Sequence, residues 1–420
     1  MTERTLSRPR AYRRTPRWVF WLRRSIAAAL TLVIVTTSWS LISVLRAPGT
    51  DDAPTRLAEW SRDHYLGPLV TLAETAQYKL NPPVTGGSPD TSLLAQAANS
   101  VDAATTTDGS NSTIASNAVT STTPANAAIA TNATKRPSTL VSIQIPTQPP
   151  IHTPVTPSLP GEGRFVHAAS TSAGPALQIA YVRPDSIHTS YLTGVAWMSH
   201  TLHFVLHPGY EDPGTAGMSQ PDLITPSAFP GLMATFNGGF KMKDANGGYY
   251  DNGHFAAPLV KGAASFVIYK DGHATVGTWG NDVHMGPKVA FVRQNLQPLI
   301  TKGKLAPNLS SNVQSNWGAT IGGAYYVWRS GIGITKSGDL VYVMGDALSV
   351  SSLADILHRA GAVTAMQLDI NRAWTSFMYY KHPTSTTVKP HKMGTFNRPV
   401  ERYLQDTSRD FFAVYDPKVA

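Results

Sequence analysis

The most constraining feature of this sequence is an uncharged, apolar stretch near the N-terminus, Ser25–Leu45. Its length of about 20 residues matches the hydrocarbon core of a bilayer, because an α-helix rises about 1.5 Å per residue. Arginines crowd the segment before it, and Asp51 and Asp52 follow it. The positive-inside rule therefore predicts a transmembrane anchor over 25–45, a basic cytoplasmic tail over 1–24 and an extracellular C-terminal part.

A cleaved signal peptide is the alternative for the same stretch. The basic region and the apolar run are both long for a signal peptide, and no clear small-residue cleavage site follows, so we predict an uncleaved signal-anchor in the cell membrane. The net charge of +9 fits this interpretation, because eight arginines lie within the tail. A basic tail before an apolar span is a topology signal, and we expect no nucleic-acid partner.

Composition divides the rest of the chain into three parts. Residues 46–80 have a helical apolar rhythm and predict a juxtamembrane helical segment that packs on the main domain or on the bilayer surface. Residues 81–160 are rich in Thr, Ser, Ala and Pro and have few large apolar residues, so they predict a disordered linker. Residues 161–420 are left for a folded domain, which is long enough to bury a sizeable core.

The domain must be held by that core, because the chain contains no cysteine and so cannot form disulfides. Short β-branched and aromatic runs end at Gly, Pro, Asn or Asp, and hairpin turns are predicted at Asp271-Gly272, Gly322-Gly323 and Ser337-Gly338. The segment "SVSSLADILHRAGA" predicts one clear helix, with Ser352 and Asp355 as a capping box. The fold class is therefore α+β: an antiparallel-sheet-rich domain with a few packed helices.

A first candidate site follows the β-type run that ends at Asn237. Gly238 and Gly239 allow positive φ and bring backbone N–H groups close to a ligand, and the Asn237 amide offers a donor and an acceptor to a sugar hydroxyl. A plain Gly-Gly turn with a capping Asn is the alternative. Further on, Tyr250 is expected to offer an aromatic face to a sugar, and Asp251 supplies a carboxylate.

A second candidate site lies in "MQLDINRAWTSF", where an apolar run gives way to a loop at Asp369. A carboxylate in this position suits a glycosidase base or nucleophile. Asn371 and Arg372 follow as hydrogen-bonding groups, and Trp374 as a stacking surface. The alternative is that Asp369 only caps the next turn. We expect no metal or cofactor, because the spacing of the acidic residues does not follow the EF-hand loop. The acidic residues still leave a divalent cation open as an alternative.

These residues resemble the phosphodiester glycosidase family, which includes the uncovering enzyme and bacterial proteins linked to exopolysaccharide. The family is marked by an "NGGFF" strand end, a later "RTAIG" strand and an "NLDGGGS" loop after a helix. The matching segments are Asn237–Phe240, Trp317–Gly323 and Leu353–Phe377, in the same order. The resemblance covers roughly Gly161 to Tyr415. The chain departs from the family at Lys241 and in the loop after Asp369, where side chains replace the three glycines.

The resemblance implies hydrolysis of an anomeric C–O bond to a phosphate. It assigns Asp369 as nucleophile or base, with Asp251 as the second carboxylate. The phosphate charge would be met by Lys241, Arg293 and Arg372, and sugar hydroxyls would be held by Asn237 and Asn371. The predicted protein is thus a membrane-anchored extracytoplasmic hydrolase acting on a glycosyl phosphodiester or a cell-envelope polysaccharide. The alternative is a non-catalytic glycan-binding or exopolysaccharide-assembly protein.

Overall fold

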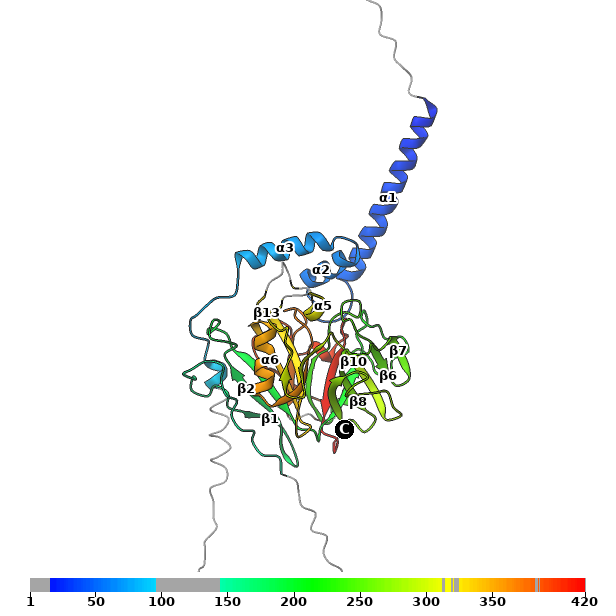
Figure 1. Cartoon of the computed structure of the whole chain (residues 1–420). Coiled ribbons are helices and arrows are strands. Elements are labelled where there is room, and N and C mark those ends of the chain that lie inside the picture. Colours follow the sequence, from blue (N-terminus) through cyan, green and yellow to red (C-terminus); the bar gives the residue numbers. More distant parts are fainter. Residues whose placement is uncertain are drawn as a thin grey trace, which may run out of the picture. The chain divides into compact units, whose positions relative to one another are not determined.

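The computed structural model describes residues 16–95, 144–311, 314–318, 320, 325–381, 384 and 386–419. Most of the expected basic tail and residues 96–143 of the expected disordered linker therefore lie outside the described residues. The chain, drawn in Figure 1, divides into two compact units between Val70 and Thr71.

The first unit contains helices α1 (Arg17–Leu45) and α2 (Ala53–Asp63) and the first turn of α3 (Gly67–Leu80). No residue of α1 is buried, and the helix is long and apolar enough to cross a membrane. The Arg56 guanidinium of α2 caps the end of α1, because it donates to carbonyls that follow or close that helix: Val44, Ala47, Pro48, Gly49 and Asp51. This arrangement satisfies groups that a helix end leaves without partners.

The second unit is built on three sheets, in which every pairing between named strands is antiparallel. The largest has eight strands, in the order β1 (Val166–Thr171), β2 (Gly174–Val182), β3 (Thr193–Met198), β14 (Leu340–Leu348), β13 (Val327–Thr335), β15 (Ala362–Gln367), β11 (Pro298–Thr301) and β12 (Lys304–Leu305). This architecture confirms the predicted α+β class.

The two smaller sheets have five strands each. One has the order β7 (His254–Ala257), β6 (Tyr249–Asp251), β10 (Val289–Gln294), β8 (Ala264–Tyr269) and β9 (Ala274–Thr278). The other has the order β17 (Lys389–Lys392), β16 (Phe377–Lys381), β5 (Leu232–Asn237), β18 (Phe411–Tyr415) and β4 (His203–His207). Short helical turns, α5 (Gln314–Trp317), η1 (Pro226–Ala228) and η3 (Arg402–Leu404), lie in the connections. Two predicted hairpin turns are confirmed, Asp271-Gly272 between β8 and β9 and Ser337-Gly338 between β13 and β14. The third, Gly322-Gly323, lies outside the described residues.

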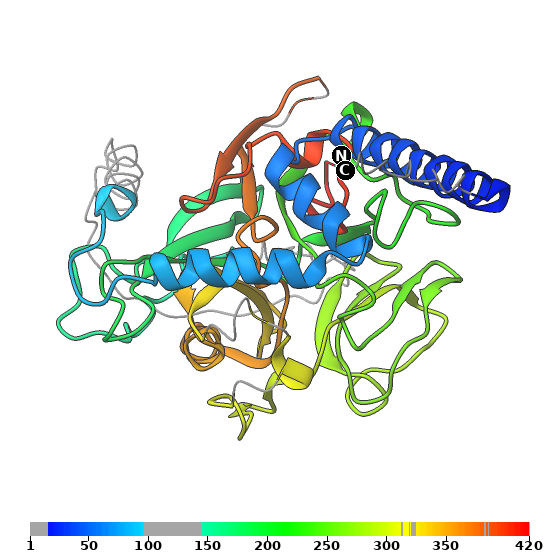
Figure 2. The same ribbon diagram turned by 90° about the horizontal axis from the view of Figure 1, so that it is seen from above.

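Helix α6 (Val350–Arg359) packs its apolar side on β13, β14 and β15, as Figures 1 and 2 show. The predicted helix is confirmed, but the predicted capping residues are wrong by one turn. Ser349 is the N-cap, and it exchanges hydrogen bonds with Ser352. Asp355 instead pairs with Arg359, because four residues on a helix place two side chains on the same face.

The packed part of the second unit begins before the expected boundary at residue 161. Leu94, Ile145 and Ile151 are buried in the same hydrophobic cluster as the sheets. Ile145 also donates its backbone N–H to the Ala173 carbonyl at 2.7 Å. The described residues 144–160 therefore form an extended segment fixed to the domain edge, because a few apolar residues and backbone hydrogen bonds suffice to order it.

Candidate active site

The end of β5 is tied to three other segments through the side chain of Asn237. Its Oδ1 accepts from the Tyr342 hydroxyl at 2.6 Å and from the Ser376 N–H at 3.1 Å. Its Nδ2 donates to the Ser330 hydroxyl at 3.0 Å and to the Gly238 carbonyl at 2.8 Å. The amide is 3 % exposed and uses both of its ends within the protein, which indicates a structural role rather than the expected contact with a sugar.

The two glycines after Asn237 are needed for close approach, not for the positive φ expected from the sequence. Neither has a φ in the left-handed region. A Cβ on Gly238 would lie 2.2 Å from the Asp410 carboxylate, and one on Gly239 would lie 3.0 Å from Asn295 Oδ1. The turn therefore packs directly against buried polar side chains that only glycine admits.

Those side chains include a fully buried ion pair. Arg293 Nε lies 2.7 Å from Asp410 Oδ2, and neither side chain is exposed. The same guanidinium donates to the carbonyls of Gln294 and Phe240. Burial raises the pKa of the Asp410 carboxyl, and the charge of Arg293 opposes this shift. Arg293 was expected to meet a substrate phosphate; its position indicates instead that it supports the turn after β5.

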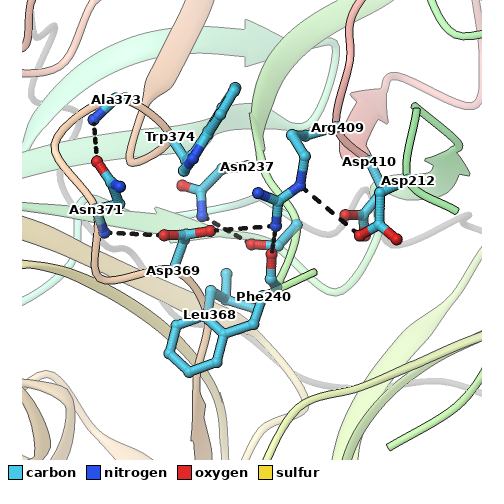
Figure 3. A network of polar contacts seen from close by, with 12 residues as sticks. Asp212, Asn237, Phe240, Leu368, Asp369, Asn371, Ala373, Trp374, Arg409 and Asp410 are labelled. Atoms are coloured by element: carbon cyan, nitrogen blue, oxygen red, sulfur yellow. Dashed lines mark hydrogen bonds and ion pairs between the residues drawn. The ribbon is translucent and has the colours of Figure 1, made fainter. Parts of the chain in front are cut away.

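Asp369 follows β15 and its carboxylate is held on two sides. Oδ1 accepts from the Asn371 N–H at 2.9 Å, and Oδ2 lies 3.6 Å from Arg409 Nη2 (Figure 3). The backbone N–H and carbonyl of Asp369 both hydrogen-bond to the Ser330 hydroxyl, which also accepts from Asn237 Nδ2. The two predicted site segments therefore meet at one point of β13. Asp369 is 4 % exposed, next to the half-exposed loop residues Asn371 and Ala373.

Arg409 is a further candidate site residue, and no sequence motif indicated it. It lies just before β18, donates from Nη2 to the Gly239 carbonyl at 3.1 Å, and reaches Asp369 with the same group. Its Nε lies 3.8 Å from Asp212 Oδ2, and that carboxylate accepts from the Met242 N–H (Figure 3). Arg409 thus bridges the Gly-Gly turn and the candidate catalytic carboxylate. Adjacent charges before an apolar run, "RDFF", were its only sequence signal.

Trp374 lies beside this pair and is surrounded by three guanidinium groups. The Cζ atoms of Arg398, Arg402 and Arg409 lie 5.0, 5.3 and 5.1 Å from its rings. The indole is 3 % exposed, so it offers little surface to a sugar; its position indicates that it collects arginines through cation–π contacts. The result is a concentration of positive charge next to Asp369.

The described part of the Trp317–Gly323 motif contacts the other two motif segments, Asn237–Phe240 and Leu353–Phe377. Gly318 packs so closely on Phe240 that a Cβ would lie 2.3 Å from the ring, and it also faces Ile370. Asn295 joins the same segments, because it accepts from Phe240 N–H and donates to the carbonyls of Gln367 and Leu368. All three motif segments therefore converge around Asp369, although residues 319 and 321–324 lie outside the described residues.

Asp251 and Tyr250 belong to β6, in a different sheet from Asp369. The Asp251 carboxylate accepts from Ser219 N–H and hydroxyl at 2.8 and 2.5 Å, and is 1 % exposed. Tyr250 packs on Phe255 at 4.8 Å between ring centroids. These contacts indicate structural roles for both residues. Among the described residues, no group of three acidic, His or Cys side chains gathers that could hold a metal ion.

Two cationic residues and one more carboxylate lie toward the surface of this region. Lys241 is half-buried, and Arg372 is exposed with a hydrogen bond of 3.2 Å to Asn397. Asp346 is the one position of β14 that is not buried. Burial still raises the pKa of its carboxyl, against the opposing effects of the Ala347 N–H and the Arg372 charge. The pairings of β13 place Asp346 and Asp369 at the same end of the large sheet.

Comparison with known proteins agrees with the motifs. A family model described as phosphodiester glycosidase matches residues 230–390, which include the Asn237 turn, Asp369 and the loop after it. The resemblance stated from the sequence is therefore confirmed over that region. No curated protein matches the chain.

Several solved structures share similarity at low sequence identity. One is the zebrafish N-acetylglucosamine-1-phosphodiester alpha-N-acetylglucosaminidase catalytic domain, auto-inhibited by its pro-peptide, with 14 % identity, a TM-score of 0.39, and coverage of 60 % of this chain and 87 % of that one. A hypothetical protein from Synechocystis has 11 % identity and a TM-score of 0.32, with 58 % and 63 % covered. A protein from Burkholderia pseudomallei described as exported has 10 % identity and a TM-score of 0.34, with 54 % and 74 % covered.

Proposed function

We propose that this chain is a membrane-anchored hydrolase of the phosphodiester glycosidase type, acting outside the cell on a glycosyl phosphodiester or an envelope polysaccharide with glycosyl phosphate links. The observation that carries the proposal is the convergence of three motif segments on one carboxylate–guanidinium pair, Asp369 and Arg409. The match of the family model to residues 230–390 supports the same reaction class. The apolar helix α1 supports the anchor.

The cationic and acidic side chains would have different roles in such a reaction. A phosphate monoester is a good leaving group, because its second pKa is near 6. The site must therefore bind the phosphate and assist at the anomeric carbon. A guanidinium can donate two parallel hydrogen bonds to phosphate oxygens, so we assign phosphate binding to Arg409, with Arg372 and Lys241 at the rim. Asp369 acts as nucleophile or base at the anomeric carbon.

Asp346 suits the second carboxylate better than Asp251. Strand β13 separates Asp346 from Asp369, so their backbones are about 10 Å apart at strand spacing. The burial that raises the pKa of the Asp346 carboxyl favours its protonated form, which is the form that a general acid needs. Asp251, by contrast, is occupied by Ser219. Arg372, on the loop after Asp369, lies close enough to influence Asp346.

The test is hydrolysis of a panel of α- and β-glycosyl phosphodiesters by the purified full-length protein in detergent, with binding measured in parallel. We expect turnover by the wild type, and at least a 100-fold loss of kcat in Asp369→Asn with binding retained, as is typical for removal of a catalytic acid or base. Asp355→Asn, on the exposed face of α6, is the matched control and should keep full activity.

Two results would contradict the proposal. Full activity of Asp369→Asn would remove that carboxylate from catalysis. Binding without turnover by the wild type across the panel would favour the alternative, a glycan-binding module in which the nearly buried Asp369–Arg409 pair only shapes the surface.

A further inference from the structure

Helix α3 exposes a continuous leucine face. Leu69, Leu72 and Leu80 are 62 %, 66 % and 79 % exposed. At about 100° per residue these three positions fall on one side of the helix, together with the exposed Ala73 and Ala76. No residue of α3 is buried. A contiguous apolar stripe of this kind is uncommon on the surface of a soluble domain.

The other side of the same helix is polar and is the side that is partly covered. Glu74, Thr75 and Tyr78 are half-buried, and the Tyr78 hydroxyl lies against the backbone of Tyr326. The helix therefore turns its polar side toward protein and its leucines toward the surroundings. This is the reverse of a helix on a water-facing surface, where the apolar stripe packs on the core.

The chain reaches α3 from the apolar helix α1 through the short helix α2. Within the first unit, Arg56 fastens α2 to the carbonyls at the end of α1, and the Trp60 indole donates to Ser40 of α1 at 3.0 Å. The Leu66 N–H then donates to the carbonyl of Ser61, which lies in the last turn of α2. The first turn of α3 therefore belongs to the same compact unit as the end of α1, where a membrane-spanning helix would leave the bilayer.

We propose that α3 is an interfacial helix, whose Leu69, Leu72 and Leu80 insert into the boundary between headgroups and acyl chains of the bilayer that α1 crosses. Helices of this kind lie in the plane of the interface with the apolar face toward the lipid. Among the residues of α3 only Glu74 and Lys79 are charged, and neither lies at the centre of the leucine face. The inference rests on the membrane-spanning assignment of α1 proposed above, but not on the enzymatic assignment.

The absence of cysteine from the chain makes the test clean, because each introduced thiol is unique. Single variants Leu72→Cys and Leu80→Cys carry a nitroxide on the leucine face. Thr71→Cys is the matched control, because Thr71 itself is exposed although it lies on the opposite, polar side of α3, and Leu32→Cys in α1 is the lipid reference. The full-length protein is reconstituted in phospholipid vesicles, and relaxation of each label by oxygen and by a water-soluble nickel chelate is measured.

We expect the labels at positions 72 and 80 to follow the one at 32, with oxygen the stronger relaxant, and the label at 71 to respond mainly to nickel. Response to nickel at 72 and 80, with 32 still in lipid, would overturn the interfacial helix and leave the anchor intact. Protection of 72 and 80 from both reagents would also overturn it, because a protein surface would then cover the leucines. A response to nickel at position 32 would overturn both the interfacial helix α3 and the membrane anchor α1. Hydrolysis is measured separately, so none of these results bears on the enzymatic proposal.

Discussion

Gly238 shows how the candidate site depends on single atoms. A Cβ there would lie 2.2 Å from the Asp410 carboxylate, which cannot retreat without leaving Arg293. We expect Gly238→Ala to lower the free energy of unfolding by about 1–3 kcal/mol, as overpacking usually does. Gly286→Ala is the control, because nothing lies within 4 Å of its added Cβ. Urea denaturation of both variants checks this, and equal midpoints would contradict it.

The Arg293–Asp410 pair should be costly to break from one side. Asp410→Ala would leave a guanidinium with no exposure and no carboxylate in that position. Removing one partner of a buried pair typically costs about 3–5 kcal/mol. The matched change, Asp355→Ala, removes an exposed pair at 2.6 Å on α6 and should cost about 0.3–0.5 kcal/mol. Similar losses in the two variants, measured by chemical denaturation, would show that the buried pair has no special role.

His207 predicts a loss of stability in mild acid. Its Nδ1–H donates to the Pro221 carbonyl at 2.8 Å, and its buried Nε2 has no partner within the described structure. Burial lowers the pKa of this imidazole to about 4, whereas the unfolded chain has a pKa of about 6.5. The unfolded state therefore binds the proton first, and stability falls as the pH drops from about 6.5 toward 4.

Between pH 7.5 and 5 this group should remove about 2 kcal/mol, at about 1.4 kcal/mol per pH unit below 6.5. The measurement compares wild type with His207→Gln by denaturation at both pH values. The variant should lose less stability on acidification than the wild type. An identical pH dependence would assign the acid sensitivity to other groups.

At the level of elements, α6 depends on a cap that the sequence placed one turn too late. The Ser349 hydroxyl accepts from the Ser352 N–H at 2.9 Å, and the Ser352 hydroxyl accepts from the Ser349 N–H at 2.8 Å. Loss of an N-cap typically costs about 1 kcal/mol, so Ser349→Ala should lower the unfolding free energy by that amount. Ser351→Ala, in the same turn but outside the box, should change it by less than about 0.5 kcal/mol. Equal effects would remove the cap assignment.

Elements defined by local sequence could be predicted, and those defined by distant partners could not. Turns at Asp271-Gly272 and Ser337-Gly338 and the amphipathic α6 follow from nearest neighbours. The order of strands in the sheets depends on pairings between distant segments, such as β5 with β18. For that reason Arg409, two residues before β18, carried no motif, although it completes the candidate site.

The fold of the whole molecule explains why several predicted site residues have structural roles. Asn237, Arg293 and Trp374 have the residue types of a binding site, but three sheets close around them and use their polar groups internally. Asp369 is buried as well, at 4 % exposure, but it is followed directly by the loop in which Asn371 is half-exposed and Arg372 is exposed. Residue type and motif order could thus indicate the region of the site, while the internal contacts that occupy each side chain depend on the whole fold and could not be predicted.

The central claim is that segments around residues 237 and 369 form one site with Arg409. The most direct measurement is a crystal structure of the protein with a non-hydrolysable glycosyl phosphonate. We expect the phosphonate to contact Arg409 or Arg372, with the anomeric carbon facing Asp369. A ligand bound elsewhere, for example in the cavity of about 500 Å³ lined by Trp197, Lys336 and Arg359, would contradict it.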